Sequence, residues 1–155
     1  MIIDNLRLTI FIFVGAILEV IINNTTILYI DILGIILVII LVNEIYTIGS
    51  LIFISLVADL IGHWYLGSHL LSLVLISFTT SRFINFYKMC NSIQKNFITI
   101  LYYSISVCFL VAIGAITRTM HFSLISYLLE VIFLLPIILW LFNKIIIKTT
   151  MDIIN

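Results

Sequence analysis

The chain has 155 residues and no net charge, with 64% hydrophobic and 9% charged residues, and its mean hydropathy is +1.37. A soluble domain typically has about 45–50% apolar and about 25% charged residues, so this composition excludes a soluble globular domain. It also excludes intrinsic disorder, which needs low hydrophobicity and high charge. The few basic residues give no electrostatic basis for binding nucleic acid.

Six apolar stretches separated by polar residues predict a single all-α integral membrane domain over residues 1–155. The predicted transmembrane helices, each of which ideally needs about 20 residues, cover residues 8–22, 27–42, 46–61, 66–83, 97–116 and 122–142. The polar segment Arg82–Asn96 separates the fourth span from the fifth. We expect a solvated basic loop there, in preference to a segment that lies on the membrane surface or faces a cytosolic partner.

The basic residues predict the orientation of the six spans. Loops on the cytoplasmic side of a membrane protein carry an excess of lysine and arginine. With six spans, only Arg118 falls on one side, and the other six basic residues share the opposite side: Arg7, Arg82, Lys88, Lys95, Lys144 and Lys148. Both termini are therefore predicted to be cytoplasmic.

The ionisable residues within the predicted spans lie in their outer halves. These acids are Glu19, Asp31, Asp59 and Glu130. A charge inside a span usually costs about 2.5–3.5 kcal/mol on insertion scales, so each acid needs an explanation. Asp31 falls in the first turns of its span, where the helix dipole favours a negative charge, and we expect a solvated or dipole-paired acid. For Glu19 and Glu130, a hydrogen bond between helices and a polar cavity are equally good interpretations.

Asp59 has the strongest case for a specific partner, because it lies in the last turn of its span, where the helix dipole disfavours another negative charge. The first backbone N–H groups of the next span, near Gly67 and Ser68, are candidate donors across a tight hairpin. Arg118 and His63 are others, and a hydrated carboxylate at the headgroup level is the alternative. Gly62 and Gly67 fit a turn that needs unusual backbone angles or close approach.

The remaining residues of chemical interest have structural interpretations. His63, His69 and His121 lack the spacing of a helical metal pair, so we expect histidines at the membrane interface and no metal site. Pro136 lies inside the last span and predicts a packing kink in preference to a moving hinge. No catalytic motif or phosphate-binding loop is present, so we expect no enzyme activity and no cofactor.

Residues 49–78, GSLIFISLVADLIGHWYLGSHLLSLVLISF, contain a predicted helix ending in Asp59-Leu60, a turn with Gly62, and Leu66-Gly67 at the start of the next helix. This pattern resembles the signature region of the rod shape-determining protein MreD family of bacteria. The segment IFLLPIILWLFNKIIIK, residues 132–148, is similar to the last helix of that family, which commonly carries a proline and ends in a basic cytoplasmic tail.

This resemblance implies a non-catalytic role in the cell-wall elongation machinery of the bacterial cytoplasmic membrane. The implied partners are an MreC-like protein and possibly MreB, a glycan polymerase and a penicillin-binding transpeptidase. The six-helix shape of the family is similar to substrate-binding components of energy-coupling-factor transporters. The outward acids could line a cavity for a cationic vitamin or ion, so the alternative is a membrane subunit of a small-solute transporter.

Overall fold

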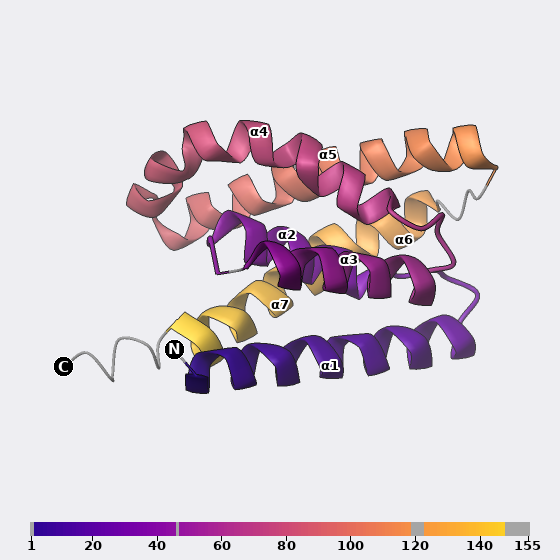
Figure 1. Cartoon of the computed structure of the whole chain (residues 1–155), viewed down its shortest axis with the longest axis horizontal. Helices are drawn as coiled ribbons and strands as arrows, with labels where there is room; N and C mark the ends of the chain where they lie inside the picture. Colours follow the sequence, from indigo (N-terminus) through magenta and orange to yellow (C-terminus); the bar gives the residue numbers. More distant parts are fainter. Residues whose placement is uncertain (1, 46, 119–122, 148–155) are drawn as a thin grey trace.

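The computed structural model describes residues 2–45, 47–118 and 123–147, and every regular element in these ranges is a helix (Figure 1). The first five helices are α1 (Ile2–Thr25), α2 (Ile32–Val42), α3 (Ile48–Ile61), α4 (Ser68–Met89) and α5 (Ser92–Thr117). The last helical run consists of α6 (Leu124–Leu129), a π-helical segment (Glu130–Leu134), α7 (Leu135–Phe142) and a second π-helical segment (Asn143–Ile147).

Successive helical runs cross the molecule in alternate directions (Figure 1). The connections after α1 and α3 lie at one end of the molecule, and those after α2 and α4 lie at the other. The first turns of α1 pack against the second π-helical segment, so the first and last described turns share an end. We call the opposite end, where segments 26–31 and 62–67 lie, the loop end.

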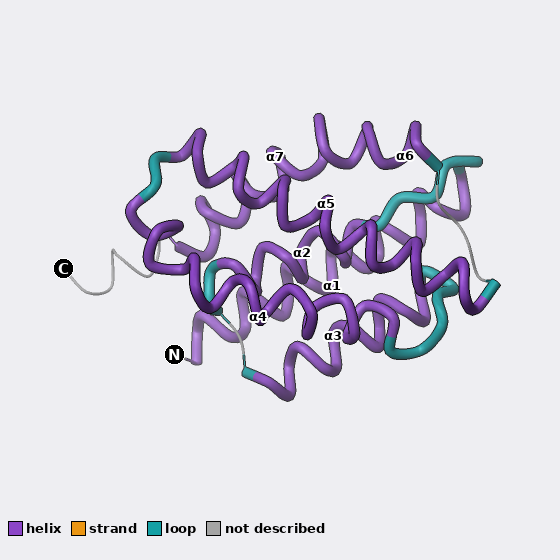
Figure 2. The backbone as a smooth tube through the Cα atoms, turned by 90° about the horizontal axis from the view of Figure 1, so that it is seen from above, coloured by secondary structure: helices purple, strands orange, loops and turns teal. Residues whose placement is uncertain are grey.

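Helix α2 forms the centre of the molecule (Figure 2). All of its 11 residues are buried, and it packs against α1, α3, α4, α5 and α7. Its sequence, ILGIILVIILV, is apolar on every side, which is typical of a helix surrounded by protein. Gly15 of α1 allows this close packing, because a side chain there would collide with Ile36.

Three helical segments are long and apolar enough to cross a membrane: Leu6–Thr25, Ser92–Thr117 and Leu124–Ile145. Three shorter apolar helices accompany them, covering Ile32–Val42, Ile48–Ile61 and Ser68–Thr80. The outer faces of the long helices carry exposed apolar side chains such as Phe13, Phe97 and Phe133. These features confirm the expected helical class and indicate a membrane protein.

Two predicted boundaries are wrong. The second span was expected from residue 27, but α2 begins at Ile32, because the carboxylate of Asp31 accepts the Gly34 N–H and caps the helix there. Most of Arg82–Asn96 was expected to be a loop, but α4 continues to Met89 and α5 begins at Ser92. A reciprocal cap between Asn91 and Gln94 starts α5 immediately, so the break is confined to two residues, 90–91.

The irregularity expected at Pro136 is a π-helical segment, Glu130–Leu134, that immediately precedes α7. Proline has no N–H to donate to the carbonyl group four residues earlier. A widened turn is one of the standard ways in which a helix accommodates such a missing hydrogen bond. This segment also begins at Glu130, and thus places an acid of interest at the point where the helix is irregular.

The basic residues are divided between the two ends of the molecule, as the sequence predicts. Arg7 in the first turns of α1, Lys88 at the end of α4, Lys95 at the start of α5 and Lys144 after α7 belong to the end opposite the loop end. Arg118 follows α5 at the loop end. Lys148 lies outside the described residues, as does the side chain of Arg82.

Candidate functional site

A network of buried ionisable side chains lies near the loop end. The exposed fractions are 0% for Glu19 and Asp59, 1% for His69, 4% for Glu130 and 5% for Asp31. These residues come from α1, α3, α4, the last helical run and the residue that caps α2. Buried charges are tolerated only with good partners, so the hydrogen bonds of each acid define the site.

Asp59, at the end of α3, caps the start of α4. Its Oδ2 accepts the backbone N–H of Gly67 at 2.6 Å. Its Oδ1 accepts the backbone N–H of His69 at 3.1 Å and contacts His69 Nδ1 at 2.7 Å. The expected pairing with Gly67 is therefore confirmed, whereas the Ser68 N–H donates to the Tyr65 carbonyl instead. With no exposed area, Asp59 is not the hydrated headgroup-level acid of the alternative interpretation.

The other candidate partners of Asp59 lie elsewhere. Arg118 is exposed, ends α5 in the left-handed conformation with φ of 59°, and belongs to none of the ion pairs found among the described residues. His63 is also exposed and left-handed, with φ of 54°. His121 lies outside the described residues.

The turn that carries Gly62 and Gly67 needs both glycines. Gly67 has φ of 94°, which is in the left-handed region that favours glycine. Gly62 has an ordinary φ, but a side chain there would collide with the Tyr29 hydroxyl and the Trp64 ring. The expectation of unusual angles or close approach is confirmed by one glycine of each kind. Leu66, the other hairpin residue of the resemblance, is exposed.

His69 joins two aspartates, a role that the sequence did not predict. Its Nε2 lies 3.0 Å from Asp31 Oδ2, while its Nδ1 faces Asp59. The expectation of an interfacial histidine is wrong here, because His69 is buried inside the protein. Both ring nitrogens face carboxylate oxygens, so two protons must be shared by these three side chains. Together the three side chains therefore carry one net negative charge.

Asp31 connects His69 and Asp59 to the rest of the network. Its Oδ1 accepts the Gly34 N–H at 2.7 Å, which confirms the dipole-paired interpretation and excludes the solvated one. A side chain at Gly34 would collide with the Asp31 carboxylate, so glycine makes room for the cap. The backbone N–H of Asp31 donates to Glu130 Oε1 at 2.8 Å.

The two glutamates have different surroundings. Glu130 Oε2 accepts a hydrogen bond from the Tyr103 hydroxyl at 2.7 Å, and Glu130 also lines a cavity. Glu130 therefore both forms a hydrogen bond between helices and lines a cavity, the two interpretations that the sequence leaves open. Glu19 Oε2 accepts the Leu33 N–H at 2.7 Å, which links α1 to the start of α2. Within the described part of the chain, the other oxygen of Glu19 has no hydrogen-bond partner.

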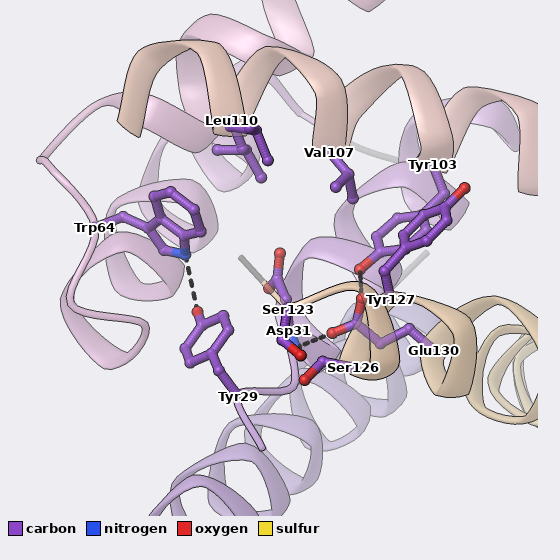
Figure 3. A pocket seen from close by; sticks show the side chains of 11 residues that line it. Tyr29, Asp31, Trp64, Tyr103, Val107, Leu110, Ser123, Ser126, Tyr127 and Glu130 are labelled. Carbon is purple, nitrogen blue, oxygen red and sulfur yellow. Dashed lines mark hydrogen bonds between the residues drawn. The ribbon is translucent and has the colours of Figure 1, made fainter. Parts of the chain in front are cut away.

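A small cavity of about 30 Å³ adjoins the network (Figure 3). Trp64 and Tyr29 lie on one side, Tyr103, Tyr127 and Glu130 on the other, and Val107 and Leu110 of α5 cover it, with Asp31, Ser123 and Ser126 between them. Trp64 Nε1–H donates to the Tyr29 hydroxyl at 2.9 Å, which fixes both rings.

In the described ranges, no group of three or more histidine, cysteine, aspartate or glutamate side chains is arranged to hold a metal ion. The buried ionisable side chains instead form a hydrogen-bonded network that joins all the helical runs. No family model, no curated protein and no solved structure matches the chain.

Proposed function

We propose that this chain is a non-catalytic, MreD-like component of the cell-wall elongation machinery, embedded in the bacterial cytoplasmic membrane. The observation that carries the proposal is the hairpin of α3 and α4. Asp59 accepts hydrogen bonds from the start of α4, and Gly67 adopts a left-handed conformation in the turn where the chain reverses direction. The residues of the resemblance, Asp59-Leu60 and Leu66-Gly67, therefore lie at the point that closes the hairpin.

The proposed topology has six crossings and cytoplasmic termini. It is supported by the alternating directions of the helical runs and by the grouping of Arg7, Lys88, Lys95 and Lys144 at one end. In this topology the shorter helices α2 and α3 cross the membrane beside longer helices, against which they pack. A cysteine-accessibility assay on Ser92→Cys and Ser123→Cys, in a background without Cys90 and Cys108, should label the first from the cytoplasm and the second from outside.

A scaffold role is supported by the small amount of chain outside the helices. The described connections are short, so recognition of a partner must use helix faces and turns. The outer face of α1 carries Ile10, Phe13 and Ile17, and that of α5 carries Phe97 and Leu101, all exposed. Such faces contact either lipid or the transmembrane helix of another protein. We propose an MreC-like protein as the direct partner, with MreB, a glycan polymerase and a transpeptidase in the same assembly.

Site-specific photocrosslinking tests the partner directly. A photoreactive amino acid at exposed Phe13 or Phe97 should crosslink to the MreC-like protein from at least one of the two faces. The matched control is Leu37 in α2, which is fully buried and should give no intermolecular product. Absence of crosslinks from every exposed helix face, with the protein at normal abundance, would contradict the proposal.

Depletion tests the cellular role. Loss of the protein from a rod-shaped cell that depends on it should produce round or widened cells, and wild-type protein should restore the rods. Normal rods and normal placement of new wall after depletion would contradict a role in elongation, whatever the crosslinking shows.

A second candidate, a membrane subunit that binds a small solute for transport, is favoured by the cavity beside Asp31 and Glu130. Its volume of about 30 Å³ admits a group of only a few atoms. A vitamin of ordinary size would therefore need a wider conformation. A strong stabilisation by one vitamin in a thermal-shift screen would favour this candidate over the scaffold.

A further inference from the structure

We propose that the cavity between Trp64, Tyr103 and Glu130 binds a primary ammonium group carried on a short apolar stem. The inference is independent of the partner proposed above, because it concerns a site inside one chain. It is carried by the charge of the network, an unpaired hydroxyl group and the aromatic walls of the cavity.

The network lacks positive charge. Asp31, Asp59 and His69 share two protons and retain one net negative charge, as their contacts require. Glu130 adds two further carboxyl oxygens, which accept hydrogen bonds from the Asp31 N–H and the Tyr103 hydroxyl. Among the described residues, no ion pair joins a lysine or arginine to these acids. A cation in the cavity would offset part of this charge.

An unpaired polar group lies at the same place. The hydroxyl of Ser126 lines the cavity, is 3% exposed as a residue, and has no hydrogen-bond partner in the described structure. A buried polar group without a hydrogen-bond partner is unfavourable. With the carboxylates of Asp31 and Glu130, Ser126 supplies a third acceptor. Three acceptors match the three N–H donors of a primary ammonium group.

The residues that line the cavity favour an ammonium group over a hard metal ion. The aromatic side chains of Tyr29, Trp64, Tyr103 and Tyr127 line the cavity, and aromatic faces attract organic cations through their quadrupole. Hard divalent cations instead bind mainly to carboxylate groups, and within the described residues no group of three or more histidine, cysteine, aspartate or glutamate side chains is arranged to hold a metal ion. Its volume of about 30 Å³ is room for roughly two water-sized groups, so a quaternary ammonium with three methyl groups is too large.

A wider cavity of about 300 Å³ adjoins the small one and shares Val107, Val111 and Tyr127 with it. It lies between α5 and α6 and is mainly apolar, with Ser104 and Cys108 as its other lining residues. The adjoining cavity therefore suits the apolar stem of a small alkylamine.

Binding is tested with methylammonium, n-butylammonium and tetramethylammonium chloride on purified full-length protein at constant ionic strength. Saturation-transfer NMR measures contact, and thermal unfolding measures stabilisation. We expect saturable binding of the two primary ammonium ions, with butylammonium tighter because its stem enters the wider cavity. Equal stabilisation by tetramethylammonium or by sodium chloride would overturn the proposal, as would the absence of any saturable signal.

Matched variants connect the binding to the cavity. Glu130→Gln removes the carboxyl group but keeps both hydrogen bonds, because the amide oxygen accepts the Asp31 N–H and the amide nitrogen donates to the Tyr103 hydroxyl. It should weaken butylammonium binding at least tenfold. Glu19→Gln replaces a buried carboxyl group that does not line the cavity and should change binding much less. Equal losses in the two variants would contradict the assignment.

Ser126→Ala keeps the proposal testable if Glu130→Gln does not fold. It should weaken butylammonium binding about fivefold, the effect of one lost hydrogen bond. Ser77→Ala, on α4 and away from the cavity, is its control and should leave binding unchanged. Unaltered binding to a folded Ser126→Ala protein would exclude the serine as a ligand and overturn the three-acceptor site.

Discussion

The backbone N–H of Asp31 donates to the Glu130 carboxylate at 2.8 Å, which joins two residues 99 positions apart. Asp31 uses its side chain at the same time to cap α2 and to contact His69. A single residue therefore connects the second, fourth and last helical runs. Changes anywhere in this network should act on the stability of the whole bundle and not on one helix alone.

Asp59→Leu should destabilise the protein far more than Asp59→Asn. Leucine leaves the N–H groups of Gly67 and His69 without an acceptor, whereas the asparagine oxygen can still accept one of them. Removing one partner of a buried charged pair typically costs about 3–5 kcal/mol. Thermal unfolding in detergent and the amount of protein in membranes would measure the difference. Wild-type values for both variants would show that this carboxylate has no structural role.

His69→Phe should also be strongly destabilising, because it leaves Asp31 and Asp59 without their shared donor. His69→Gln keeps one side-chain donor and should recover part of the loss. The exposed His63, six residues earlier, is the control, and His63→Asn should change stability by less than about 0.5 kcal/mol. Comparable melting temperatures for His69→Phe and His63→Asn would contradict the buried bridge.

Gly67→Ala should destabilise the protein, whereas Gly49→Ala should not. Gly67 has φ of 94°, where alanine is strained, so a loss of about 1–2 kcal/mol is expected. Gly49 lies in α3 with no atom near the position of an added side chain, and alanine there should be neutral or stabilise by up to about 1 kcal/mol. The two unfolding midpoints, measured side by side, test whether the hairpin needs a left-handed residue.

Tyr103→Phe should lower stability by about 1–3 kcal/mol, the typical cost of leaving a buried acceptor without its donor. The lost bond is the one from the Tyr103 hydroxyl to Glu130. Tyr65→Phe, at an exposed turn residue, should have little effect. If the two phenylalanine variants unfold at the same temperature, Glu130 does not depend on Tyr103.

The sequence predicts the helical membrane class and the Asp59 hairpin because both depend on local patterns. Long apolar runs indicate helices in a membrane, and an acid at the end of one span beside the start of the next finds its donors within about ten residues. The His69 bridge was missed because its second partner, Asp31, is 38 positions away and comes from another helix. A histidine in the first turn of α4, next to the capped N–H groups, was the available local signal.

The missed helix in Arg82–Asn96 has a different physical cause. The polar residues of this segment predict a loop, but a helix that leaves the apolar region can continue with a polar surface. The cap between Asn91 and Gln94 was readable in the sequence and marks the actual boundary. Residue polarity predicts where a segment meets water, whereas capping residues predict where a helix ends.

The shortness of α2 has a consequence for how the backbone is solvated. Its 11 residues rise only about 16 Å, roughly half of the ~30 Å of a bilayer's hydrocarbon layer. Segment 26–31 therefore dips toward the middle of the protein, below the ends of the long helices. In lipid, such irregular backbone survives only where protein groups replace water. Asn23 forms hydrogen bonds with both backbone groups of Ile30, and Glu130 accepts the N–H of Asp31, so protein side chains take the place of water at the backbone that leads into α2.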